Sequence, residues 1–170
     1  MVHAYLMYGY PTQTVQETVD SLEMVRQLFE VGVLQSGFWH QFAMTAHSPV
    51  GINPKEFKVE TATKKLGSFA NNDMICIDKS GAEHEKFSDG LKKSLFNYMH
   101  GICFDFDLQE WFEFKVPKTK MAANFIHQAI QQGENFKLKG NTRIVWKGNT
   151  IQTKPSAKKG KVEMIVSSRR

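Results

Sequence analysis

The first hydrophobic segment of the chain is short and shows little alternation between apolar and polar residues. It runs from His3 to Tyr8 as HAYLMY, the pattern of a strand that is buried on both faces, as in a parallel sheet. A polar turn follows it, and then Thr14-Val-Gln-Glu17 has the form of a capping box. In a capping box two side chains satisfy backbone donors at a helix start. The pattern therefore predicts a strand, a turn and then a helix from about residue 15.

A single apolar stripe runs along this expected helix, at steps of three and four residues. Such a stripe predicts that the helix covers a sheet, while the polar positions on its opposite side face water. Gly32 suits the end of the helix, because glycine readily adopts the left-handed conformation found there. The stripe consists of Val15, Val19, Leu22, Val25 or Met24, and Phe29, and the polar positions are Glu17, Asp20, Glu23 and Arg26.

A second apolar segment, SGFWHQFAM at 36–44, predicts another buried strand. Strand, helix and strand in this order indicate a right-handed βαβ unit with parallel strands. The carboxyl ends of such strands form the rim at which α/β proteins bind ligands. The turn from Gly9 to Thr14 and the strand end at 43–47 therefore lie on this rim. Two interpretations of the turn stay open: it binds a ligand, or Gly9 and Pro11 only shape the chain.

The character of the sequence changes at about residue 50, where proline and glycine gather between His47 and Pro54. We place a domain boundary there. After a short apolar strand at 74–77, an apolar face over 84–101 predicts a long helix. Pro117 suits the first position of a further helix. The apolar stripe of the first helix is Phe87, Leu91, Leu95, Met99 and Ile102, and that of the second is Met121, Phe125, Ala129 and Ile130, with Gly133 at its end.

The last segment has the pattern of a small antiparallel β meander. Strands are predicted at 143–147 and 150–153, joined by the hairpin dipeptide Gly148-Asn149, and a third strand at 161–167 follows a loop that starts at Lys154. The chain thus divides into three predicted parts, which are a βαβ portion, a mainly helical region and a basic β tail. The expected fold class is α/β in the first part and α+β overall. The parts cover 1–50, 51–136 and 137–170.

Positive charge is concentrated in this tail. From Lys137 to Arg170 there are ten basic residues and one acid, Glu163, a net charge of +9 (10 − 1). Positions 1–136 hold 12 basic and 16 acidic residues, a net charge of −4 (12 − 16). The chain has no apolar run long enough to span a membrane and no secretory signal pattern. We therefore expect a cytoplasmic protein without a membrane partner.

Spacing alone identifies no catalytic residue and no metal ligand. The six histidines match none of the familiar zinc-ligand patterns, and we interpret them as satisfied core or surface residues. A Gly-x-Ser-x-Gly nucleophile motif is absent. The two cysteines, Cys76 and Cys103, lack the CxxC spacing, and we interpret them as small buried hydrophobes.

At the predicted rim the sequence becomes recognisable. The segment LMYGYPTQT, with its helix and the following strand that ends in FAMTAHSPVG, resembles the fifth and sixth strand regions of the radical S-adenosylmethionine (SAM) enzymes. The closest likeness is to the subgroup that carries an N-terminal cobalamin-binding domain. The stretches GLKKSLFNYMHG and LQEWFEF resemble the C-terminal region of that subgroup. The resemblance therefore covers most of the chain.

The resemblance implies a partial (β/α) barrel, of which this chain holds the last βαβ strands. It also implies an oxidoreductase in which a [4Fe-4S] cluster, held by a CxxxCxxC loop, cleaves SAM to a 5'-deoxyadenosyl radical, with cobalamin left open as a further cofactor. Family regions that contact the adenosine part of SAM, largely through backbone and apolar atoms, carry over to eight residues. They are Gly9, Tyr10, Pro11, Gln13 and Thr14 in the turn, where many family members have Glu at the position of Gln13, and Phe42, Ala43 and Met44 at the second strand.

One departure from the family decides what we expect of this chain. A radical SAM cluster needs three grouped thiolates, but the sequence contains two cysteines and no CxxxCxxC, and the family's glycine-rich second-strand motif is absent. We therefore expect a C-terminal fragment that holds no cofactor of its own, contributes part of the SAM and substrate rim, and is inactive alone. The strand predicted at residues 3–8 has one sheet edge left open. We expect this edge to associate with the missing N-terminal portion of the same enzyme, to self-associate, or to be covered by the C-terminal helices.

A second function is considered for the basic tail. Its charges accompany Ile144, Val145 and Trp146 in the predicted hairpin, a composition that fits a nucleic-acid-binding module acting on RNA. The alternative interpretation is a solvated basic hairpin without a partner.

Overall fold

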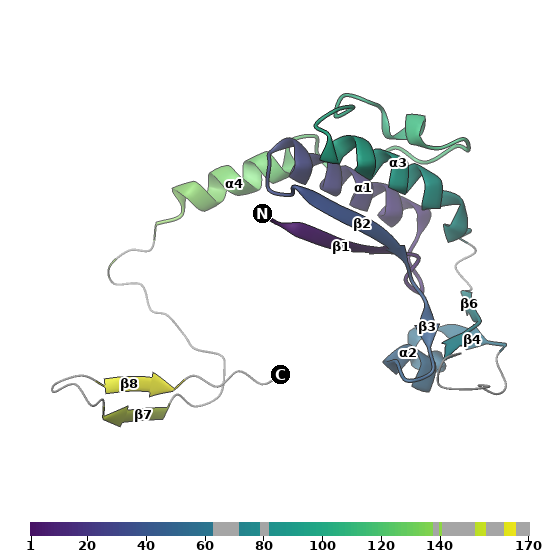
Figure 1. Ribbon diagram of the computed structural model, residues 1–170, viewed down its shortest axis with the longest axis horizontal. Helices are drawn as coiled ribbons and strands as arrows, with labels where there is room; N and C mark the ends of the chain where they lie inside the picture. Colours follow the sequence, from purple (N-terminus) through teal and green to yellow (C-terminus); the bar gives the residue numbers. More distant parts are fainter. Residues whose placement is uncertain (63–71, 79–81, 138–139, 141–151, 156–161, 166–170) are drawn as a thin grey trace. The chain divides into compact units, whose positions relative to one another are not determined.

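The computed structural model describes residues 1–62, 72–78, 82–137, 140, 152–155 and 162–165 (Figure 1). The chain folds as two compact units, Met1–Glu134 and Asn135–Arg170. Helices and small sheets are mixed, and the fold class is α+β. The three-part division of the sequence, with its boundary at about residue 50, stays a prediction.

The first unit is built around a βαβ element. Strand β1 (His3–Tyr8) leads through a turn into helix α1 (Val15–Glu30) and on to strand β2 (Ser36–Gln41). The two strands pair in parallel along their whole length. The predicted parallel βαβ arrangement is therefore confirmed, although its second strand ends at Gln41 rather than at Met44.

Helix α1 begins where the capping box predicts. Glu17 N donates a hydrogen bond to Thr14 Oγ1 at 3.2 Å, and Thr14 N donates one to Glu17 Oε2 at 2.7 Å. Two backbone donors at the helix start are therefore satisfied. Gly32, with a φ of 74°, follows the end of the helix, as predicted. The apolar stripe is buried at Val19, Leu22, Val25 and Phe29.

Helices α1 and α3 (Ser88–Met99) lie together on one face of the two strands (Figure 1). Burial therefore alternates along β1, with Tyr8 buried and Tyr5 exposed, because successive side chains of a strand point to opposite faces. The prediction that β1 is buried on both faces is wrong. The main core fills the space between the covered face and the helices and includes Tyr8, Trp39, Leu22, Leu91, Leu95 and Tyr98.

Two polar residues of α1 are buried although their positions were predicted to face water. Glu23 is 5% exposed and Arg26 is 9% exposed. The reason is that later segments of the chain pack on this side of α1. Arg26 Nη1 donates a hydrogen bond to Phe104 O at 2.9 Å, and Gln27 Nε2 donates one to Ala122 O at 2.8 Å.

Asp20 ties the segment after the short helix η3 (Leu108–Trp111) to α1. It accepts hydrogen bonds from Lys120 N at 2.7 Å and from Thr119 Oγ1 at 2.8 Å. Burial opposes ionisation of Asp20, but these hydrogen bonds outweigh it and hold the pKa of the carboxyl below its ordinary value. The hydrogen bonds therefore hold the segment against α1.

This segment, which is neither helix nor strand at residues 115–120, occupies the positions at which a helix was predicted to start. Helix α4 (Phe125–Asn135) begins well after Pro117. None of its residues is buried, and Ile130 is 37% exposed. The predictions of a helix start at Pro117 and of a buried stripe ending at Ile130 are therefore wrong.

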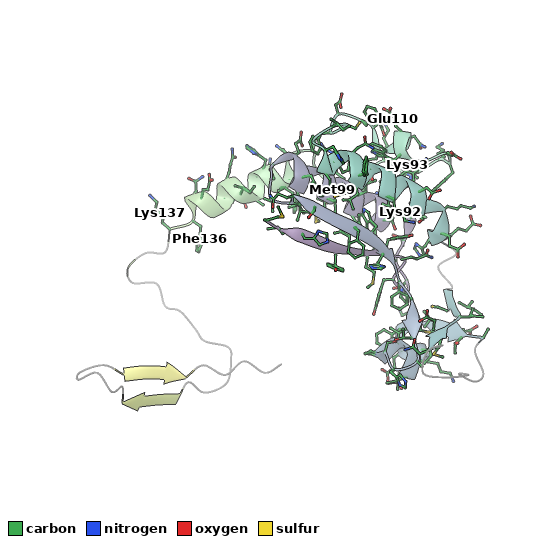
Figure 2. The ribbon with its side chains drawn as sticks, in the orientation of Figure 1. Lys92, Lys93, Met99, Glu110, Phe136 and Lys137 are labelled. Atoms are coloured by element: carbon green, nitrogen blue, oxygen red, sulfur yellow. The ribbon has the colours of Figure 1, made fainter. Side chains whose placement is uncertain are left out.

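The long helix predicted over 84–101 is present in two parts. Residues His84–Phe87 form a 3-10 helix, η2, which leads directly into α3. Met99, labelled in Figure 2, is 37% exposed and Ile102 is 52% exposed, although both were assigned to the apolar stripe. The stripe is buried as predicted at Phe87, Leu91 and Leu95.

The described residues between 42 and 78 form a smaller lobe with its own core of Met44, Val50 and Val59. It contains two antiparallel strand pairs. The strand predicted at 74–77 is split, with its first residue in one pair and its last two residues in the other. The pairs join β3 (Met44–Thr45) to β5 (Asp73–Met74) and β4 (Val59–Thr61) to β6 (Cys76–Asp78), and the short helices α2 (Pro49–Ile52) and η1 (Pro54–Phe57) stand between β3 and β4 in the sequence.

In the second unit the structure describes strands β7 (Gln152–Pro155) and β8 (Val162–Ile165), which pair antiparallel. Strand β8 confirms the strand predicted at 161–167, and β7 extends into the loop predicted from Lys154. The strand predicted at 143–147 lies outside the described residues. The first strand of the meander, at 143–147, and the RNA-binding role of the tail stay predictions.

Candidate functional site

The side chain of Gln13 holds the turn that joins β1 to α1. Its Oε1 accepts hydrogen bonds from Gly9 N at 2.6 Å and from Tyr10 N at 3.2 Å. Gln13 N donates to Tyr10 O at 2.9 Å. One side-chain oxygen therefore satisfies two backbone donors inside the turn. Among the described residues Nε2 of Gln13 makes no hydrogen bond.

Gly9 occupies a position that does not accept a side chain. Its φ of 74° lies in the left-handed region, which residues with a Cβ rarely adopt. A Cβ on Gly9 would lie 3.2 Å from Cβ of His84, a buried residue of η2. The turn was predicted from the local pattern, but the packing of His84 against it was not, because no local signal links positions so far apart.

The end of β2 reaches the same turn through Phe42. Phe42 N donates a hydrogen bond to Tyr8 O at 2.8 Å. The rings of Phe42 and Tyr10 meet edge to face with their centroids 5.1 Å apart. Ala43 is exposed beside them. Met44, by contrast, is 1% exposed in the core of the smaller lobe, so the structure brings Phe42 to the turn but not Met44.

A shallow depression of about 430 Å³ lies beside the turn and is lined by Met7, Tyr10, Pro11, Thr12, Gln13 and Glu17. Glu17 was predicted only as a capping residue. Its Oε2 accepts the hydrogen bonds from Thr14 N and Thr14 Oγ1, at 2.7 Å and 2.9 Å. The backbone hydrogen bond, followed by that of the hydroxyl, holds the pKa of Glu17 below its ordinary value. The depression thus combines apolar surface with an amide and an ionised carboxylate.

The face of β1 and β2 opposite the helices is aromatic. We call the side chains of His3, Tyr5, Met7, Phe38 and His40 the open face; Tyr5 is 76% exposed and Met7 is 56% exposed. The Tyr5 and Phe38 rings lie 4.4 Å apart, and those of Phe38 and His40 lie 4.6 Å apart. This face was not predicted from the sequence, because β1 was expected to be buried on both sides. The available signal was that Ala4 and Leu6 alternate along HAYLMY with the histidine, tyrosine and methionine positions.

Replacing Gln13 with alanine is expected to lower the free energy of unfolding by about 1–2 kcal/mol, because two backbone donors lose their acceptor. Replacing it with glutamate is expected to change stability by less than about 0.5 kcal/mol, because a carboxylate oxygen accepts the same hydrogen bonds. Urea denaturation followed by circular dichroism measures both changes.

Gln132→Ala is the matched control for this pair of variants. Gln132 lies on α4 and is exposed, so the substitution should leave stability unchanged or raise it slightly through helix propensity. A Gln13→Ala variant that is as stable as the control would show that the Gln13 side chain does not hold the turn.

An iron–sulfur cluster does not fit the residues of this chain. The sequence contains two cysteines, Cys76 and Cys103, whereas a cluster with one iron left open for SAM needs three thiolates. Within the described ranges, no group of three or more His, Cys, Asp or Glu side chains could hold a metal ion.

Over the residues that the structure describes, no helix combines the length and the apolar character needed to cross a membrane. The chain matches no family model, no curated protein and no solved structure.

Proposed function

We propose that this chain is the C-terminal part of a cytoplasmic radical SAM enzyme, in which it forms the last βαβ unit of a partial (β/α) barrel. The observation that carries the proposal is the open face. In (β/α) barrels the helices cover the outer face of the sheet, while side chains of the inner face fill the interior. Two parallel strands with helices on one face and exposed aromatic side chains on the other are what part of such a barrel would present.

The depression beside the turn supports a role in binding the adenosine part of SAM. Tyr10 and Pro11 supply apolar surface for a base. Nε2 of Gln13 can donate a hydrogen bond, and the carboxylate of Glu17 can accept hydrogen bonds from ribose hydroxyls. Phe42 extends the apolar surface through its contact with Tyr10. In this proposal the chain binds and orients the nucleoside, and Thr14 and Gln13 keep the turn in its shape.

The reactive centre of the proposed enzyme lies outside this chain. SAM bound beside a reduced cluster supplies a 5'-deoxyadenosyl radical, and the two cysteines present here cannot provide the ligands of that cluster. The missing N-terminal portion of the enzyme would hold the cluster, and cobalamin if the enzyme uses it. The chain alone is therefore proposed to be inactive.

The proposal is tested by extending the reading frame upstream of the codon for Met1. We expect an in-frame CxxxCxxC within about 100–200 codons, the length of one domain. The extended protein, reconstituted anaerobically with iron and sulfide, should show charge-transfer absorption and cleave SAM, and its variant with the three cysteines changed to alanine should do neither. The chain of 170 residues, treated in the same way, should stay colourless.

Two results would contradict the proposal. One is the absence of an in-frame CxxxCxxC upstream of Met1. The other is stable iron uptake followed by SAM cleavage by the 170-residue chain without a partner.

A further inference from the structure

The open face is continuous with the depression beside the turn. Met7 contributes to both, because it stands on the exposed side of β1 and also lines the depression. Tyr5 precedes Met7 on the same face of the strand and is opposite Phe38 in the register. A molecule that lies on Tyr5 and Phe38 would therefore be next to a molecule bound in the depression.

The rings of the open face form a row in which three of the four contacting pairs are steeply inclined, while the planes of His3 and Phe38 meet at 39°. The planes of His3 and Tyr5 meet at 79°, those of Tyr5 and Phe38 at 68°, and those of Phe38 and His40 at 66°. Barrel interiors are commonly filled by branched aliphatic side chains, and this face has none. A row of this kind offers both ring faces and ring edges, the two geometries that aromatic groups prefer for mutual contact.

The charge of the open face favours a neutral ligand. Neither β1, HAYLMY, nor β2, SGFWHQ, contains Asp, Glu, Lys or Arg, so these strands supply no fixed charge that could balance a charged ligand. The imidazoles of His3 and His40 add nitrogen atoms that can form hydrogen bonds. His3 Nδ1 already forms one with Ser36 Oγ at 2.7 Å.

The area of the open face favours a small molecule over a protein partner. A fully exposed aromatic side chain offers about 150–250 Å². Because Phe38 is half-buried and the other four side chains of the open face are only partly exposed, the face offers on the order of 400 Å². Stable protein–protein interfaces bury about 800 Å² on each partner. A second copy of the chain would therefore find too little surface here, whereas one flat ring system would be largely covered.

We propose that the open face binds a planar, uncharged aromatic group and that this group belongs to the substrate of the proposed enzyme. The stacked group would lie beside the nucleoside in the depression, with a polar edge toward His3 or His40. The catalytic relevance of this site rests on the proposed function, but the binding itself can be measured on this chain. Failure of binding would therefore leave the upstream CxxxCxxC test unaffected, and the reverse also holds.

The test uses two probes with the same carbon skeleton, 2-naphthol and its saturated analogue decahydro-2-naphthol. Titration of each into the full chain is followed by the NMR signals of the aromatic and histidine side chains. We expect 2-naphthol to bind with a Kd on the order of millimolar, as is usual for a ligand of this size. The saturated analogue should bind about tenfold more weakly, because it cannot stack on the rings.

Tyr5→Leu and Phe38→Leu remove a ring but keep apolar surface, and each should weaken 2-naphthol binding about tenfold. Phe96→Leu is the matched control. Phe96 of α3 is 60% exposed and its ring lies 4.4 Å from that of His100, so it is an exposed aromatic–histidine pair outside the open face. Its replacement should leave the Kd unchanged.

Three results of the binding experiments would overturn the inference. They are equal binding of the saturated probe, an unchanged Kd in both Tyr5→Leu and Phe38→Leu, and an equal loss in Phe96→Leu. A dimer in sedimentation equilibrium that dissociates on Tyr5→Leu would overturn it as well, because a second copy would then occupy the face.

Discussion

Replacing Glu23 with alanine is expected to lower the free energy of unfolding by about 3–5 kcal/mol. Nε and Nη2 of Arg26 each donate a hydrogen bond to Glu23 at 2.8 Å, and Gln27 Nε2 donates another at 2.7 Å. The hydrogen bonds of Glu23 hold the pKa of Arg26 above its ordinary value. Without them the guanidinium still stays charged, because an arginine side chain does not deprotonate at neutral pH. Arg26 would keep only the half-exposed Glu30 as a counter-charge, and the loss of its buried partner accounts for the cost. Urea denaturation at neutral pH measures it.

Glu30→Ala is the matched control, because Glu30 accepts a hydrogen bond from the same guanidinium at 3.0 Å but its side chain is 48% exposed. The expected loss there is less than about 1 kcal/mol. The double variant Glu23→Leu with Arg26→Met removes both charges and should recover most of the stability lost in the single variant. If Glu23→Ala cost no more than Glu30→Ala, the ion pair would not be buried beneath the later segments of the chain.

The burial of Glu23 also shows which features of the fold were accessible from the sequence. The start of α1 depends on Thr14 and Glu17, which are neighbours in the chain, and the capping box predicted it. The environment of Glu23 depends on residues near Phe104 and Ala122. The spacing of apolar residues along α1 shows which side of the helix faces the sheet. It carries no information about a later segment of the chain that packs on another side of the helix.

The exposure of the open face was not predicted, for a different reason. Tyr5 and Met7 count as apolar residues, so β1 resembled a strand that is buried on both sides. Tyr and Met side chains tolerate exposure better than branched aliphatic ones do, because one has a polar end and the other is flexible. Ala4 and Leu6 alternate with the histidine, tyrosine and methionine positions of the open face. This alternation distinguishes the two faces of β1 only once the helices are known to lie on one side.

The sequence predicted the candidate turn more completely than it predicted the strand end that faces the turn. Gly9 and Gln13 act within one turn, so their spacing carried the signal. Phe42 reaches the turn as its position after β2 predicts, whereas Met44 belongs to the core of the smaller lobe. That difference depends on the pairing of Met44 with Met74, a contact between distant positions that a single sequence does not reveal.

Replacing Gly90 with alanine is expected to lower the free energy of unfolding by about 2–3 kcal/mol, although alanine is the better helix former. Gly90 lies in α3, and a Cβ there would be 2.5 Å from Phe112 Cδ1 and 2.5 Å from Trp111 O. The aromatic ring and a backbone carbonyl would both have to move, and overpacking of this kind outweighs a propensity gain of at most about 1 kcal/mol. Thermal and urea denaturation of the variant measure the net change.

Gly133→Ala places the same methyl group in α4, where no atom lies within 4 Å of the added Cβ. Here only the propensity term acts, so the variant should be more helical by circular dichroism and more stable locally by up to about 1 kcal/mol. The two substitutions are chemically identical and should have opposite signs, because Phe112 packs against one glycine and nothing packs against the other. A Gly90→Ala variant that gained stability, as Gly133→Ala is expected to do, would show that the segment around Phe112 does not pack against α3. The packing of this segment on the βαβ unit would then be wrong.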